Sequence, residues 1–146
     1  MDTDQKSPLM TTSALERHPL PVAGFLAVVS LPIHAVVPLA WSQNIAAGIL
    51  ALIAGVYIGF AANDGRLAVI ALETVVALVF ASGAMVALVL SPWWIAIGYI
   101  AHGFWDWLHH SPAFGHAVPR WYIPLCAFYD VLAGVGLLVL WGLHGS

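Results

Sequence analysis

The stretch LAVIALETVVALVFASGAMVALVL, residues 67–90, decides the fold of this chain. Its only charged residue is Glu73, and about 20 apolar residues are enough for an α-helix to cross the hydrocarbon core of a bilayer. Backbone polar groups in lipid need partners within their own segment, and a helix provides them. We therefore expect a transmembrane helix over residues 67–90.

Four other apolar runs have a similar length, and the composition of the whole chain agrees with them. Of the 146 residues, 62% are hydrophobic and 8% are charged, whereas soluble domains carry about 25% charged residues. The sequence predicts an all-α, polytopic membrane bundle of five transmembrane helices in one domain, residues 19–146, after a polar cytoplasmic arm, residues 1–18. The expected spans are residues 19–41, 45–62, 67–90, 92–110 and 121–143.

Charge and cysteine content narrow the classes of function. Four basic and seven acidic residues give a formal net charge of −3, which is too little positive charge to bind a phosphate backbone. We therefore expect the lipid bilayer as a partner and no nucleic acid. The single cysteine, Cys126, excludes an internal disulfide, and we expect it to be a small packing residue.

The basic residues predict an orientation in the membrane. With five spans, all four lie on one side: Lys6, Arg17, Arg66 and Arg120. Basic residues gather on the cytoplasmic side of membrane proteins, so the N-terminus is expected to be cytoplasmic. This orientation depends on the fourth span crossing the membrane, because a re-entrant segment there would move Arg120 to the other side.

Glycine and proline indicate helix contacts and bends. Gly55 and Gly59 form a GxxxG motif, which lets two helices approach closely; it predicts packing within the bundle or a homo-oligomer. Pro32 and Pro38 are expected to kink the first span around His34.

Three carboxylates, Glu73, Asp106 and Asp130, lie inside the expected spans, and no lysine or arginine lies there with them. An ionised carboxylate in hydrocarbon costs at least ~2.5–3.5 kcal/mol. Each must therefore face the bundle interior and meet a histidine, a metal ion, a proton or water. All three are expected in the cytoplasmic half of the bilayer.

The segment HGFWDWLHH, residues 102–110, contains the strongest local signal. On a helix, His102, Asp106 and His109 fall within about 60° of one another, a spacing at which side chains converge on one ion. We expect His102, Asp106 and His109 to bind a divalent metal, zinc or iron, and His110 to serve a second position.

Two further acids are expected to act on the same centre. Glu73 or Asp130 would be the catalytic general base, or would orient a ligating histidine by accepting a hydrogen bond from its other ring nitrogen. Asp130 forms a stripe with Cys126 and Gly134 on the last span. Whether His34 and His116 join the cluster stays open.

The string HGxWDxxHH, followed by Trp-Tyr-x-Pro at residues 121–124 and by Asp130, resembles a family of small multipass bacterial membrane proteins of unknown function. The likeness covers most of the chain and implies a place in the bacterial inner (cytoplasmic) membrane, but no activity. Asp106-x-x-His109-His110 also looks like one histidine box of the membrane fatty-acid hydroxylases and desaturases, with Asp106 in place of a histidine and no further box. Membrane ceramidase-type hydrolases are a looser analogue of the chemistry.

These residues support several functions. The first is a metal-dependent membrane enzyme acting on a lipid-like substrate, with a haem held by His34 and His102 as a lesser variant. The second is a proton- or cation-coupled carrier, since histidines and carboxylates are the usual relay groups. The third is a structural or accessory subunit in which the polar cluster joins helices. The sequence leaves open whether the protein is an enzyme.

Overall fold

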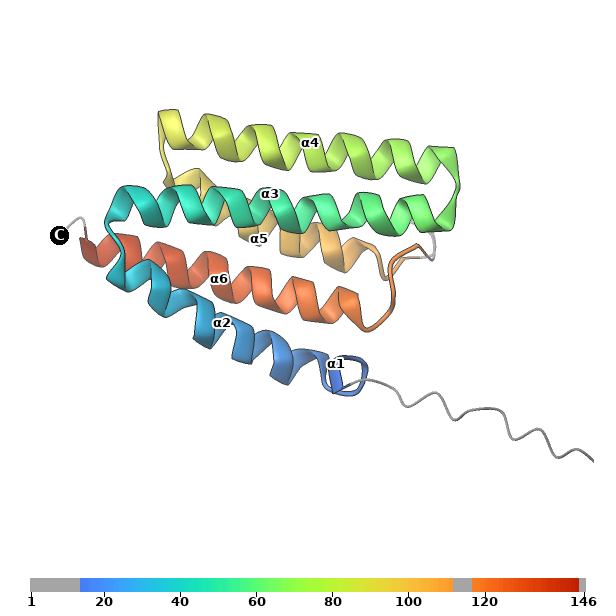
Figure 1. Ribbon diagram of the computed structural model, residues 1–146, viewed down its shortest axis with the longest axis horizontal. Helices are drawn as coiled ribbons and strands as arrows, with labels where there is room; N and C mark the ends of the chain where they lie inside the picture. The colour runs from blue at the N-terminus through green and yellow to red at the C-terminus, as the bar shows by residue number, and fades with distance from the viewer. Residues whose placement is uncertain (1–13, 112–116, 145–146) are drawn as a thin grey trace, which may run out of the picture.

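A computed structural model describes residues 14–111 and 117–144, and in these ranges the chain is helical, with no strand. This confirms the all-α class. Figure 1 shows the helices, each running antiparallel to the one before it from α2 onward. Their bounds are α1 Ala14–Arg17, α2 Pro19–Val36, α3 Leu39–Asp64, α4 Leu67–Leu90, α5 Trp93–Leu108 and α6 Tyr122–His144.

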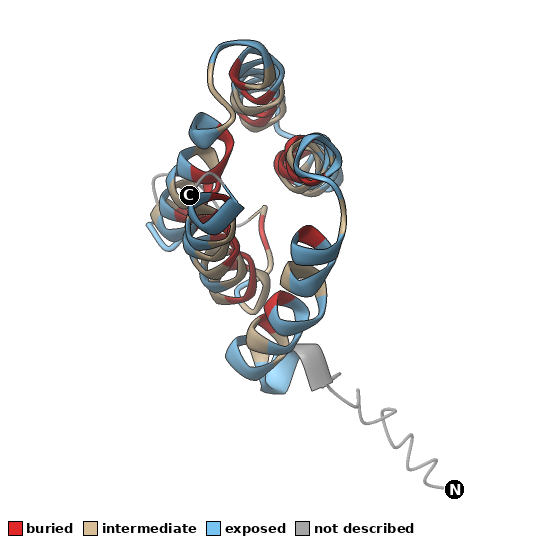
Figure 2. Cartoon of the chain, turned by 90° about the vertical axis from the view of Figure 1, so that its left-hand side faces the viewer, coloured by how far each residue is buried: buried red, intermediate tan, exposed pale blue. Residues whose placement is uncertain are grey.

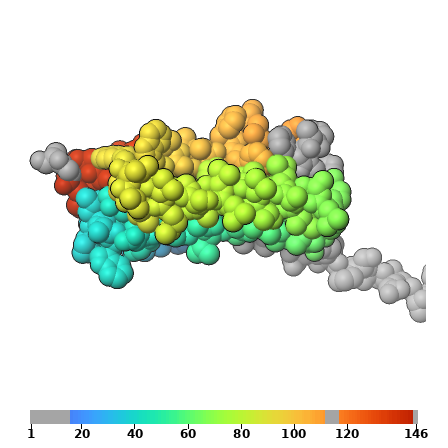
Figure 3. Space-filling view, turned by 90° about the horizontal axis from the view of Figure 1, so that it is seen from above, coloured from blue at the N-terminus to red at the C-terminus, as the bar shows by residue number. Residues whose placement is uncertain are grey.

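Four of these helices, α2, α3, α4 and α6, are long and apolar enough to cross a membrane. Most of their residues are not buried inside the bundle, and α4 forms much of one face of the molecule (Figure 3). Large apolar side chains such as Leu78, Val79 and Val89 are exposed on it. Such a surface requires a hydrocarbon environment, so the described chain is that of an integral membrane protein. At 16 residues, α5 is the shortest of the helices α2 to α6, about 24 Å long at 1.5 Å per residue.

The predicted boundary between the first two spans was wrong. The first helix was expected to run through residue 41, with a loop at residues 42–44, but α2 ends at Val36 and α3 already begins at Leu39. Pro38 lacks an N–H and disfavours helical backbone in the residue before it. Val37 is accordingly extended, with ψ of 155°, so Pro38 ends the helix rather than kinking it. Pro32 lies within α2 as expected.

The other expected spans agree with the helices more closely. Residues 67–90 match α4, residues 121–143 match α6 within one residue, and residues 92–110 are two residues too long at the C-terminal end. Arg17, Arg66 and Arg120 lie at the same end of the bundle (Figure 1), which we call the basic end. Lys6 lies outside the described residues.

The helices enclose a line of buried side chains. In order around the bundle α2 packs on α6, α6 on α5, α5 on α4 and α4 on α3, while α2 and α3 contact each other much less. Figure 2 shows the buried residues facing inward. Toward the opposite end, Ser42 joins three helices: Trp141 Nε1 donates to its hydroxyl oxygen (2.8 Å), and His34 Nδ1 lies 2.9 Å from the same oxygen.

Glycines bring α5 and α6 into close contact. A Cβ atom on Gly134 would lie 2.7 Å from the backbone oxygen of Ala96, and one on Gly103 would lie 3.0 Å from the backbone oxygen of Ala127. Neither backbone oxygen can move without displacing its helix. The α5–α6 distance therefore depends on these two glycines.

We expect Gly134→Ala to destabilise the protein by about 1–3 kcal/mol, because the added methyl group overpacks the α5–α6 contact. The measurement is the midpoint of unfolding by SDS in mixed micelles. Gly83→Ala is the matched control, because a Cβ there has nothing within 4 Å and alanine favours a helix. Equal midpoints for the two variants would contradict the close contact.

Candidate metal centre

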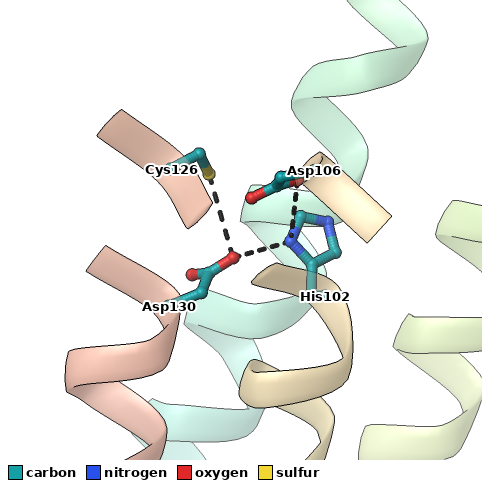
Figure 4. Close-up of side chains that lie close together, drawn as sticks. All are labelled: His102, Asp106, Cys126 and Asp130. Carbon is teal, nitrogen blue, oxygen red and sulfur yellow. Dashed lines mark hydrogen bonds and ion pairs between the residues drawn. The ribbon is translucent and has the colours of Figure 1, made fainter. Parts of the chain in front are cut away.

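Two helices present four chemically active side chains to one point. His102 and Asp106 lie one turn apart on α5, and Cys126 and Asp130 lie one turn apart on α6. Figure 4 shows the four side chains pointing toward one another. His102 Nδ1 lies 2.7 Å from Asp130 Oδ2 and 3.4 Å from Asp106 Oδ1, and Cys126 Sγ lies 3.9 Å from Asp130 Oδ2.

The group is buried and has no cationic side chain other than the histidine. His102, Asp106, Cys126 and Asp130 are each at most 3% exposed. Within residues 14–111 and 117–144 they form no ion pair with lysine or arginine, and Arg66 pairs instead with Asp64 at the α3–α4 turn. Both carboxylate oxygens of Asp106, and Oδ1 of Asp130, have no hydrogen-bond partner. Buried acceptors in this state are costly unless a proton, a metal ion or water satisfies them.

The donor atoms have the spacing and chemistry of a metal site. One atom from each of the four residues lies within 4.8 Å of the others. Two ligands of a tetrahedral zinc ion lie roughly 3.3–3.6 Å apart at the usual bond lengths, and the observed 2.7, 3.4 and 3.9 Å bracket this value. Small side-chain movements would therefore suffice. Nitrogen, oxygen and sulfur donors together suit zinc or iron.

Cys126 differs from its expected role as a packing residue. It is buried as expected, but its thiol lies inside the donor group and also contacts the Tyr122 hydroxyl at 3.8 Å. The sequence contains a signal for this arrangement. Cys126 precedes Asp130 by four residues, which is the spacing of His102 and Asp106, so the two helices present matching pairs.

Glu73 and His109 form a second buried pair, apart from the donor group. His109 Nε2 lies 2.9 Å from Glu73 Oε1, and His109 Nδ1 lies 3.0 Å from the backbone oxygen of Trp105. A carbonyl oxygen only accepts, so Nδ1 carries a hydrogen and donates it. The contact between Nε2 and Glu73 then holds one further hydrogen, bound to either partner. The pair is thus a place where a single proton can move between nitrogen and oxygen.

Tyr57 of α3 lies between the pair and the donor group. Its ring centroid is 4.9 Å from that of His109 and 5.6 Å from that of His102. Its hydroxyl is buried close to Asp106. Sequence reasoning missed this residue, and the only available signal was a tyrosine inside an apolar span.

The remaining histidines lie elsewhere. His110 is exposed and lines a groove on the outside of α5 and α6. His34 is bonded to Ser42 toward the opposite end of the bundle, so it does not join the cluster and does not face His102. His116 lies outside the described residues.

The fold and the donor group define a class: a helical-bundle membrane protein with a buried group of side chains suited to a metal ion. Comparison with known proteins adds no family to this class, because no family model, no curated protein and no solved structure matches the chain.

We expect Glu73→Leu to lower the stability by about 1–3 kcal/mol, because it removes the partner of a buried imidazole nitrogen. Glu73→Gln is the matched control, since an amide can donate or accept at the same place. The measurement is again the midpoint of SDS unfolding in mixed micelles. Equal unfolding midpoints for the leucine and glutamine variants would show that the pair has no structural role.

Proposed function

We propose that this protein is a metal-dependent membrane enzyme that acts on a lipid-like substrate. The observation that supports the proposal is the arrangement of His102, Asp106, Cys126 and Asp130: four buried donors without a basic partner among the described residues. Two ionised carboxylates and a ligating thiolate carry three negative charges, of which one divalent cation offsets two. In a medium of low dielectric constant, offsetting these charges greatly lowers the free-energy cost of burying them.

The residues suggest a division of work around such an ion. His102 Nδ1, Asp106, Cys126 Sγ and Asp130 Oδ2 would hold it. A bound divalent metal supplies a polarised substrate oxygen or an activated water. Asp130 Oδ1 has no partner in the structure, so it is available to accept a proton from that water. We assign the role of general base to Asp130 rather than to Glu73, which is bonded to His109 outside the group.

We further propose five membrane spans with a cytoplasmic N-terminus, in the bacterial inner membrane. Arg17, Arg66 and Arg120 share one end of the bundle, and basic residues prefer the cytoplasmic side. Although α5 is short, it packs between α4 and α6 and runs from the opposite end toward the basic end, which supports its counting as a span.

A proton- or cation-coupled carrier is the second candidate. It is favoured by the Glu73–His109 pair, which holds one transferable proton beside Tyr57. In this function the donor group would bind a proton or a transported cation instead of a resident metal. Proton flux into liposomes that is lost in Glu73→Gln would favour it over the enzyme.

The metal is tested on protein purified without chelator and dialysed against zinc, with metal counted by plasma mass spectrometry. We expect about one ion per chain in the unmodified protein, as in protein zinc sites. His102→Gln should lose most of it, because it removes the nitrogen donor. His110→Gln is the matched control on the same helix end and should keep it.

A cobalt-loaded sample gives a second measurement of the same site. We expect a cobalt–thiolate absorption band that disappears in Cys126→Ser and persists in His110→Gln. Absence of bound metal from the folded protein, or equal metal in the two histidine variants, would overturn the metal site.

We also propose a homo-oligomer through Gly55 and Gly59. A Cβ on either glycine has nothing within 4 Å in the described chain, so this close-packing face is not used inside the bundle. A bulky residue there would block a second copy.

We expect Gly59→Leu to lower the yield of crosslinked dimer severalfold in detergent. Gly83→Leu is the control on another exposed helix face. An unchanged dimer yield in Gly59→Leu would contradict the interface.

A further inference from the structure

A groove between α2, α3 and α6 is lined in part by Cys126, one residue of the donor group. It has a volume of about 380 Å³ and is open along one side. Its apolar walls are formed by Leu26, Val29 and Ile33 of α2 and by Ile49 and Ile53 of α3. The groove exists because α2 packs on α6 and separates from α3 with increasing distance from the turn at Pro38 (Figure 1).

The α6 wall of the groove includes Cys126, which belongs to the donor group. This wall consists of Tyr122, Leu125, Cys126 and Tyr129. The Tyr122 hydroxyl lies 3.8 Å from Cys126 Sγ, and the Tyr129 hydroxyl donates to Ser30 Oγ at 3.3 Å. An apolar channel with a few polar atoms at one place is the usual form of a small-molecule site.

Two other grooves on the described bundle differ from it in this respect. One lies outside α5 and α6, and the other lies between α2 and α6 near Pro32. Both are as apolar, but none of the four donor residues lines them. Among these three grooves, only the α2–α3–α6 groove is lined by a residue of the candidate metal centre.

We infer that the α2–α3–α6 groove binds the single hydrocarbon chain of an amphiphilic substrate and delivers its polar group to the Cys126 side of the metal centre. The inference rests on the proposed function and names its substrate class. The groove is continuous with a surface that faces lipid, so hydrocarbon is the material that fills it. If each methylene group is taken to fill about the 30 Å³ of a water molecule in the liquid, the groove's volume of about 380 Å³ corresponds to roughly a dozen methylene groups. That is one chain, not the two tails of a phospholipid.

The polar atoms determine which way the chain lies. Tyr122 and Cys126 lie in the first turns of α6, near the basic end, whereas Ile33 lies toward the opposite end of α2. A head group beside Tyr122 can accept its hydrogen bond and reach the metal centre, and the tail then extends toward Ile33. Exchanging head and tail would place a polar group among Val29, Ile33 and Ile49 with nothing but Ser30 and Tyr129 to bond it.

The test uses a fatty acid with a photoactivatable diazirine in the middle of its chain, mixed at a low fraction into phosphatidylcholine vesicles that contain the zinc-loaded protein. After illumination, mass spectrometry locates the label. We expect it on the peptides that contain residues 26–33 and 122–129. Ile53→Trp fills the groove and should lower this labelling severalfold. Leu52→Trp, whose side chain is 72% exposed and lies outside the groove, should leave it unchanged.

A second pair of variants keeps the result interpretable if Ile53→Trp fails to fold. Val29→Trp fills the groove from α2, and Val28→Trp is its neighbour outside the groove. Label spread evenly over the lipid-facing helices, or equal labelling of both members of each pair, overturns the groove site. Metal content, counted in the same samples, separates the two proposals: labelling without metal refutes the proposed enzyme alone, and metal without groove labelling refutes this inference alone.

Discussion

The contact between α5 and α6 is the constraint on which the site depends. Gly103 and Gly134 let the two backbones approach until a Cβ at either position would touch a carbonyl oxygen of the other helix. At this separation His102 on one helix and Asp130 on the other come within 2.7 Å. Short side chains such as aspartate and cysteine reach across only a narrow gap. The glycines thus belong to the site as much as the donors do.

Membrane residence makes this arrangement informative. A soluble protein can leave a carboxylate near water, but a bundle surrounded by lipid must satisfy its acids within itself. Glu73 meets this demand with His109. Asp106 and Asp130 share one histidine, His102, between them. One imidazole cannot neutralise two carboxylates, so the deficit is located at a single point on the α5–α6 contact.

Much of the fold follows from the sequence, because apolar length and helical spacing are local properties. Residues 67–90 match α4, and the i, i+4 spacing of His102 and Asp106 places them together on α5. What the sequence did not predict depended on tertiary contacts. His109 shares a helix face with His102, but it contacts Glu73 because α4 packs on α5. Cys126 joins the donor group because α6 lies against α5. The end of α2 at Val36 is a local effect of Pro38 that outweighed the apolar run.

The two ends of the bundle show the difference between a structural polar cluster and a functional one. At the opposite end Ser42 accepts from Trp141 and bonds His34, and no buried polar atom of these three residues lacks a partner. Interhelical hydrogen bonds of this kind average about 0.6 kcal/mol, and the cluster is complete without a ligand. The α5–α6 group instead leaves three carboxylate oxygens and His102 Nε2 without hydrogen-bond partners. A cluster that served only to join helices would gain stability by satisfying these atoms or by replacing them with apolar ones, so their presence beside a lipid-facing groove favours a site that binds something.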